Sequence, residues 1–166
     1  MTRKTLVTKL HSEVKSIGGH EVKKGLVTKM QVVLADTYLL YLKTQNFHWN
    51  VEGLNFLTYH ELFERQYKDL AEAADNIAER IRALGSKAPG SFAEFSKLSH
   101  ISEGDSSMDA KAMIKSLLED QKKITKALKS ALHQAQSEGD EPTADLMIQR
   151  LAIHEKNAWM LRATLG

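Results

Sequence analysis

Apolar residues recur at three- and four-residue steps along most of the chain, which is the spacing of amphipathic helices. The stretches that follow this spacing cover residues 22–49, 56–84, 109–137 and 142–164. Glycine-, proline- and serine-containing sequences separate them, and Pro142 is suited to a first helical turn. The pattern therefore predicts four long helices.

The connection between the second and third helices distinguishes this bundle from a simple up-and-down one. It spans roughly 24 residues, whereas two to eight are usual between neighbouring helices. It carries one short helical segment, FAEFSKL at 92–98. A single long crossover in the middle of four helices is the ferritin-like arrangement. We therefore predict an all-α, ferritin-like four-helix bundle whose crossover carries a short extra helix.

Composition narrows the class of protein. The 166 residues, 42% of them hydrophobic, suit one globular domain with a substantial core. The chain has no run of about 18 apolar residues and no apolar stretch near its N-terminus, so we expect no membrane span, no secretory signal and a cytoplasmic location. The absence of cysteine excludes disulfides, thiolate metal ligands and cysteine nucleophiles.

Positive charge is concentrated at the N-terminus. Residues 1–25 contain six basic and two acidic residues, a balance of +4, against +2 for the whole chain. We therefore divide the chain into a basic arm, residues 1–20, and a bundle domain, residues 21–166. Such an arm suggests an anionic partner such as nucleic acid, although short basic termini are also common on proteins that bind none.

The second predicted helix carries four ionisable residues on one face. His60, Glu64, Asp75 and Glu79 form two i,i+4 pairs within about 100° of arc. The midpoints of the pairs lie roughly 22 Å apart along the helix, whereas metal–ligand bonds are about 2 Å long. One ion therefore cannot touch both pairs in one chain. If the pairs cooperate, two antiparallel helices must meet at a twofold axis near residue 69, so that each subunit supplies half of each site.

A fifth candidate, His48, ends the first helix. The glycine-containing turn at 50–55 reverses the chain, so we expect the His48 and His60 rings to converge. Two imidazoles with three carboxylates suit iron, manganese or zinc and not calcium. A diiron site inside one bundle would need Glu-x-x-His motifs. None of the seven histidines has a glutamate three positions earlier, which leaves the interface site.

Each of these residues also has an ordinary structural interpretation. His48 could be a core histidine. Ion pairs at i,i+4 spacing could occupy the second helix, namely Glu64–Lys68 and Glu61–Arg65. Asp75 and Glu79 repel one another at this spacing. The cations that could fold toward them are Arg80 and Arg82. The residues alone leave both interpretations open.

The sequence HWNVEGLNFLTYHELFE, followed by DNIAER, resembles the signature of the Dps family, the DNA-binding proteins from starved cells or miniferritins. The resemblance covers nearly the whole chain, including the closing HEKNAWMLRATLG. It implies a hollow homododecamer with tetrahedral symmetry, a ferroxidase that oxidises Fe²⁺ preferably with hydrogen peroxide, stores the ferric mineral and protects DNA. Matched to the motif, the iron ligands are His48, His60 and Glu64 of one subunit with Asp75 and Glu79 of its twofold partner.

The resemblance implies roles for further residues. Trp49 resembles a tryptophan thought to take up oxidising equivalents, although it could be a core or interface aromatic. Glu141 and Asp145 match acidic positions of threefold pores, although carboxylates at a helix N-terminus are also dipole partners. Glu64 departs from the family pattern, in which aspartate is commoner, so its contact with iron could be altered or water-bridged.

DNA binding would use the basic arm, whose cations include Arg3, Lys4, Lys9 and Lys15. Several family members do not bind DNA, and the arm also has apolar residues at helical spacing, so it could instead pack on the shell. Two alternatives follow. The protein could be a nucleoid-compacting, nucleoid-associated DNA-binding protein with a weak or vestigial metal site, or it could hold Zn²⁺ structurally at the interface.

Overall fold

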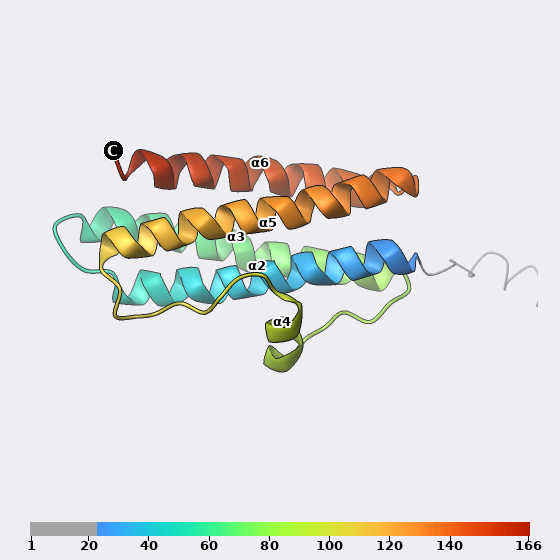
Figure 1. The fold of residues 1–166 in the computed structure, drawn as a ribbon, viewed down its shortest axis with the longest axis horizontal. Coiled ribbons are helices and arrows are strands. Elements are labelled where there is room, and N and C mark those ends of the chain that lie inside the picture. Colours follow the sequence, from blue (N-terminus) through green and yellow to red (C-terminus); the bar gives the residue numbers. More distant parts are fainter. Residues whose placement is uncertain (1–22) are drawn as a thin grey trace, which may run out of the picture.

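The computed structural model describes residues 23–166. The helices follow in the order α2 (Lys24–Asn50), α3 (Phe56–Ala83), α4 (Phe92–Leu98), α5 (Ala110–Ser137) and α6 (Glu141–Ala163). The four long helices run side by side, and α4 lies outside them on the crossover from α3 to α5 (Figure 1). This confirms the predicted all-α, ferritin-like bundle, a fold compatible with the expected 12-mer. The predicted arm, residues 1–20, lies outside the described residues, so the division into arm and bundle stays a prediction.

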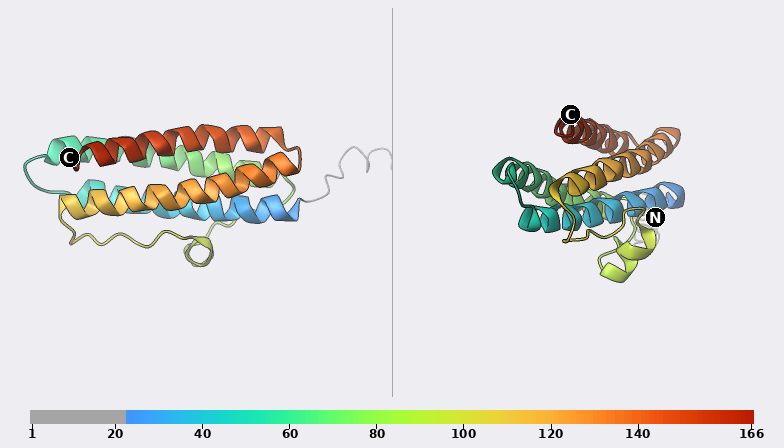
Figure 2. Two further views of the ribbon diagram at one scale, coloured as in Figure 1. Left: turned by 45° about the horizontal axis from the view of Figure 1, so that its top comes forward. Right: turned by 60° about the vertical axis from the view of Figure 1, so that its left-hand side comes forward.

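Packing between the helices follows the apolar stripes read from the sequence. Helix α2 is central: it contacts α3, α5 and α4, while α6 packs mainly on α5 (Figure 2). The largest fully buried side chains come from α2, α3 and α5 and include Met30, Leu40, Phe47, Phe63, Ile77, Leu117 and Ile124. Within residues 23–166, no helix is both long enough and apolar enough to span a bilayer.

Besides the packing of α4 on α2, two further contacts hold the crossover against α2. The buried carboxylate of Asp36 accepts hydrogen bonds from the Ser99 hydroxyl, at 2.8 Å, and from the His100 backbone N–H, at 2.7 Å. Further along, Gly104 lies directly on Lys43 and Phe47: a Cβ at this glycine would be 3.0 Å from Lys43 Cγ and 3.2 Å from Phe47 Cε1. The crossover therefore approaches α2 more closely than a larger residue would allow.

Replacing Gly104 by alanine will destabilise the protein by roughly 1 to 3 kcal/mol, because neither neighbour can move aside without strain. Phe47 is fully buried, and the Lys43 ammonium is held 2.6 Å from Asp120. Gly90→Ala is the matched control, since a Cβ there meets nothing within 4 Å. Chemical denaturation of the two variants provides the comparison, and equal stabilities would show that the crossover does not depend on this contact.

A buried histidine joins α5 to α6. The His154 ring is 1% exposed, and its Nδ1 lies 2.7 Å from Gln121 Oε1. The amide oxygen accepts, so Nδ1 carries the proton. Burial, reinforced by the nearby charge of Arg150, lowers the pKa of His154 to about 3. The folded protein therefore keeps this ring neutral at pH values where the unfolded chain protonates it.

This difference predicts a pH-dependent contribution to stability. Because the folded pKa of His154 is below the ordinary value of 6.5, its contribution is complete above pH 6.5 and is lost as the pH falls toward 3. Between pH 7 and pH 5, a His154→Asn variant should therefore lose about 2 kcal/mol less unfolding free energy than the wild type. Denaturant titrations at the two pH values measure this difference; equal losses would contradict it.

Candidate metal centre

The hairpin between α2 and α3 brings His48 and His60 into contact, as the sequence predicted. Their rings stack with centroids 3.7 Å apart and an interplanar angle of 23°. The bonds are reciprocal: His48 Nδ1 lies 2.9 Å from the His60 carbonyl oxygen, and His60 Nδ1 lies 2.8 Å from the His48 carbonyl oxygen. Gly53 turns the loop with φ of 110°, a conformation that glycine adopts without a steric penalty.

These reciprocal bonds determine which nitrogen of each ring is free. A backbone carbonyl only accepts hydrogen bonds, so Nδ1–H of both His48 and His60 is the donor. In a neutral imidazole the lone pair is then on Nε2, and this is the arrangement in which a histidine binds a metal ion. Within residues 23–166, neither Nε2 has a hydrogen-bond partner. The hairpin therefore holds two oriented imidazoles, each with an Nε2 that is able to bind a metal ion.

Aromatic side chains hold the two rings in place. Tyr67 packs edge-on against His48 at 5.1 Å, and Phe56 lies 5.0 Å from His60. His48 is 8% exposed, so it is buried as the ordinary interpretation expected, yet it keeps its Nε2 unpaired among the described residues. Trp49, in contrast, is 64% exposed and is not a core aromatic of the subunit.

Glu64 lies one turn after His60 on α3 and forms the ion pair expected of an ordinary helix surface. Its Oε1 is 2.5 Å from the Lys68 ammonium. The hydrogen bond and charge of Lys68 hold the pKa of Glu64 below its usual value, and His48 and His60 act weakly in the same direction. Glu64 is therefore a carboxylate engaged with a lysine one turn further along α3.

Asp75 and Glu79 are exposed on α3 and have no hydrogen-bond or ion-pair partner among residues 23–166. The two arginines that could neutralise them are engaged elsewhere. The Arg80 guanidinium donates to Asp140 Oδ1 at 2.7 Å, beside the start of α6, and Arg82 donates to a backbone carbonyl just beyond α3. Neither arginine is therefore paired with Asp75 or Glu79, and the ion-pair interpretation does not account for this acidic pair.

Within the described part of the chain, no three histidine, aspartate or glutamate side chains converge on a metal-sized space. His60 with Glu64 and Asp75 with Glu79 lie at separate levels of one helix, α3 (Phe56–Ala83). His48, His60 and Glu64 of one subunit therefore do not by themselves surround a metal-sized space, and the composition of a complete centre stays a prediction.

The predicted pore residues lie at the start of α6. Glu141 occupies the first turn, and Asp145, one turn later, accepts a hydrogen bond from Gln149 Nε2 at 2.7 Å; both carboxylates are on exposed residues. The preceding Asp140 caps the helix. Burial opposes its ionisation, but hydrogen bonds from Thr143 and the Arg80 guanidinium hold the pKa of Asp140 below its usual value. The carboxylate of Asp140 is therefore engaged in hydrogen bonds that stabilise the start of α6.

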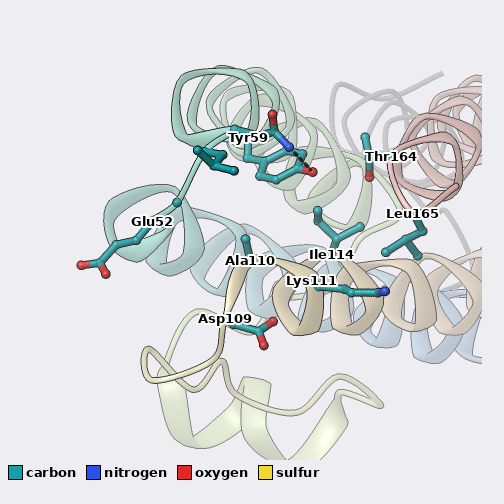
Figure 3. A pocket seen from close by; sticks show the side chains of 11 residues that line it. Glu52, Tyr59, Asp109, Ala110, Lys111, Ile114, Thr164 and Leu165 are labelled. Atoms are coloured by element: carbon teal, nitrogen blue, oxygen red, sulfur yellow. Dashed lines mark hydrogen bonds between the residues drawn. The ribbon is translucent and has the colours of Figure 1, made fainter.

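The predicted ligands do not line a deep pocket. A cavity of about 390 Å³ lies at the end of the bundle, where Glu52, Tyr59 and Asp109 meet the C-terminal residues (Figure 3). None of the predicted metal ligands is among its lining residues. Sequence reasoning missed Tyr67, which lies seven positions after His60 and hence on nearly the same helix face; this spacing could have identified it.

Comparison with known proteins gives one consistent relationship. Residues 27–166 match the ferritin-like domain family. DNA protection during starvation protein 2 of Bacillus anthracis is 37% identical over 145 residues, which cover 87% of this chain and 99% of that protein. The crystal structure of a Dps protein from Bacillus brevis aligns with a TM-score of 0.84 and 33% identity, covering 87% of this chain and 97% of that one.

A second solved structure agrees. The Dps protein from Vibrio cholerae O1, described as a member of a broad superfamily of ferritin-like diiron-carboxylate proteins, aligns with a TM-score of 0.84 and 31% identity, covering 89% of this chain and 92% of that one. These relationships extend over the whole bundle. The chain therefore belongs to the Dps family of ferritin-like proteins.

Proposed function

We propose that this protein is a ferroxidase and iron store. It oxidises Fe²⁺, preferably with hydrogen peroxide, at sites shared by two subunits, and deposits the ferric product inside a dodecameric shell with tetrahedral symmetry. The observation that carries the proposal is the oriented imidazole pair, whose Nε2 atoms have no partner among residues 23–166, with Glu64 one turn after His60 on α3. Family membership supports iron as the metal and protection of DNA as the outcome.

The proposed ligand set explains why oxidation would be favoured. His48, His60 and Glu64 of one subunit would bind Fe²⁺ together with Asp75 and Glu79 of the partner subunit. Three carboxylates stabilise Fe³⁺ more than Fe²⁺, because attraction grows with the charge of the ion. Two ferrous ions each give one electron to hydrogen peroxide; its O–O bond breaks, two protons are taken up and two water molecules form.

The surface around the imidazole pair supports a subunit contact there. Large apolar side chains at the α2–α3 hairpin are exposed in the single chain, namely Trp49, Leu54, Phe56 and Leu57. Such clustering is typical of a surface that another subunit covers. Trp49, adjacent to His48, would also be placed to take up oxidising equivalents, and Glu141 and Asp145 would line pores for iron entry.

The proposal is tested by mixing the dodecamer with Fe²⁺ and either hydrogen peroxide or dioxygen. The expected result is faster oxidation with peroxide, one peroxide consumed per two Fe²⁺, and iron that co-elutes with the shell. A protein that retains Zn²⁺ in crystals or in solution, but neither oxidises nor retains iron, would contradict the proposal and favour the structural zinc alternative.

DNA association is a second proposed activity, supported by the basic arm and by the name of the relatives. Arg3, Lys4, Lys9 and Lys15, repeated in twelve subunits, would provide salt-sensitive, sequence-independent contacts with phosphates. Gel shifts should show weaker binding for a protein lacking residues 1–20 than for the full chain. Equal binding by the two proteins would show that the arm does not bind DNA, and would contradict the nucleoid association that it implies.

A further inference from the structure

A continuous row of tyrosine rings leads away from the imidazole pair along the contact between α2 and α3. Tyr67, which packs edge-on against His48 at 5.1 Å, lies 6.2 Å from the ring of Tyr41 on α2. The Tyr41 ring lies 5.7 Å from that of Tyr38, one turn earlier on the same helix. We call Tyr67, Tyr41 and Tyr38 the tyrosine row. Each of these spacings is within the range of about 4.5–7 Å found for directly packed aromatic rings.

The tyrosine row ends beneath the crossover. Tyr38 stacks on Phe95 of α4, with ring centroids 4.6 Å apart and an interplanar angle of 25°. A phenylalanine ring is much harder to oxidise than a phenol, so Tyr38 is the last member of the row that can give up an electron. It lies about 15 Å before His48 along the axis of α2. The row therefore connects the proposed metal centre to a distant part of the bundle.

Packing alone does not require the phenol groups of the row. The fully buried aromatic side chains of α2 and α3 are Phe47 and Phe63, whereas the three tyrosines are half-buried. Among residues 23–166 the hydroxyls of the row form no hydrogen bond, whereas that of Tyr59, the fourth tyrosine, accepts from Asn55 Nδ2 at 3.4 Å. Phenylalanine would fill the same space. What the tyrosines add is the capacity to lose an electron and a proton and to regain them.

We propose that the tyrosine row carries electrons to the metal centre during peroxide reduction, an inference that rests on the function proposed above. Hydrogen peroxide takes up two electrons, and one Fe²⁺ gives only one. Tyr67 gives the second electron and releases its phenolic proton to water, so it becomes a neutral tyrosyl radical. The O–O bond of the peroxide breaks, two protons are taken up and two water molecules form.

The oxidised state then moves along the row. Tyr41 gives an electron to Tyr67 and Tyr38 gives one to Tyr41; each donor releases a proton to water, and each acceptor regains one. A second Fe²⁺ outside the centre finally gives its electron to Tyr38, whose phenol regains a proton. The overall reaction still consumes one peroxide for two Fe²⁺. Each step moves the oxidised state further from His48 and His60.

Trp49 is the alternative site of oxidation. Its side chain is 64% exposed at the hairpin and does not belong to the tyrosine row. A radical on Trp49 would stay at the surface beside the centre, whereas a radical in the row moves away from it toward α4. Ring-deuterated tyrosine distinguishes the two, because it narrows the electron paramagnetic resonance signal of a tyrosyl radical and leaves that of a tryptophanyl radical unchanged.

The test uses the full-length dodecamer with one Fe²⁺ per subunit, mixed with excess hydrogen peroxide and frozen rapidly. Electron paramagnetic resonance should show Fe³⁺ together with a tyrosyl radical, and a further equivalent of Fe²⁺ should remove the radical. Tyr67→Phe should form Fe³⁺ without the tyrosyl radical. Tyr41→Phe should keep the radical on Tyr67, and added Fe²⁺ should remove it more slowly, because Tyr38 is no longer reached.

Tyr59→Phe is the matched control, since it makes the same substitution outside the row and should give the wild-type radical. Phenylalanine keeps the ring of Tyr67 in place, so Tyr67→Phe should bind Co²⁺ as the wild type does, which visible absorption measures without any oxidation. Fe³⁺ without a tyrosyl radical in the wild type, an undiminished radical in Tyr67→Phe, or a tryptophanyl radical alone would overturn the proposal. Absence of Fe³⁺ from the wild type would instead contradict the proposed function, and the role of the row with it.

Discussion

Replacing both His48 and His60 by alanine will slow peroxide-dependent Fe²⁺ oxidation by about 100-fold. The reason is that each ring keeps its Nε2 without a partner among the described residues, while its Nδ1–H is bonded to the other residue's backbone carbonyl. The variant therefore loses both nitrogen ligands together. Stopped-flow absorbance of the ferric product measures the rate.

The matched control for this variant is His133→Ala, which removes an exposed imidazole from α5 and should oxidise iron at the wild-type rate. The double variant loses two hydrogen bonds of the hairpin, so a native mass measurement is needed to check that its shell still assembles. Wild-type rates in the double variant would show that His48 and His60 are structural residues only.

Removing the buried carboxylate of Asp120 will destabilise the protein by about 3–5 kcal/mol. Asp120 is 1% exposed and accepts from Lys43 at 2.6 Å, while Lys43 itself is 3% exposed. A second cation, Lys123, lies 3.0 Å from the other carboxylate oxygen. In Asp120→Ala the Lys43 ammonium is left inside the bundle without its counter-charge, and the melting temperature should fall by roughly 10 °C.

The double variant Lys43→Met/Asp120→Leu tests whether the loss of stability in Asp120→Ala comes from the missing ion pair or from the unpaired charge that is left behind. Because it removes both charges and fills the space with apolar atoms, its stability should be close to that of the wild type. Lys122→Met breaks an exposed pair with Glu119 and should change stability by no more than about 0.5 kcal/mol. If Lys122→Met and Asp120→Ala lowered the free energy of unfolding by similar amounts, this would contradict the claim that the effect depends on burial of the charges.

Helical periodicity accounted for most of the fold. The second helix was predicted over residues 56–84 and is found at Phe56–Ala83, and the short crossover helix was predicted and found at the same residues, 92–98. The hairpin that joins His48 to His60 also followed from one glycine-containing turn. These features are local, so the spacing of apolar residues and breakers suffices to predict them.

Contacts between helices were not predictable in this way. Lys43 and Asp120 are 77 positions apart, and their pairing depends on how α2 and α5 are rotated about their axes. The same holds for Arg80, which the sequence allowed to fold toward Asp75 and Glu79 but which instead binds Asp140. Of the pairs left open on α3, Glu64–Lys68 forms. The spacing of apolar residues predicts which face of a helix a residue occupies, but it does not predict which of the residues within reach it will contact.

The central claim is that each metal centre takes ligands from two chains, and mixing two inactive variants tests it most directly. One variant carries His48→Ala and His60→Ala, and the other Asp75→Ala and Glu79→Ala. After joint dissociation and reassembly, half of the dimers contain one chain of each kind. Each mixed dimer regains one intact site out of two, with both histidines from one chain and both carboxylates from the other.

The account predicts recovery of about one quarter of the wild-type rate of Fe²⁺ oxidation in the mixture, with neither variant active alone. Variants reassembled separately and then combined provide the control, and they should stay inactive. Activity in the co-assembled mixture that remains at the level of the separate variants would contradict a site shared between two chains.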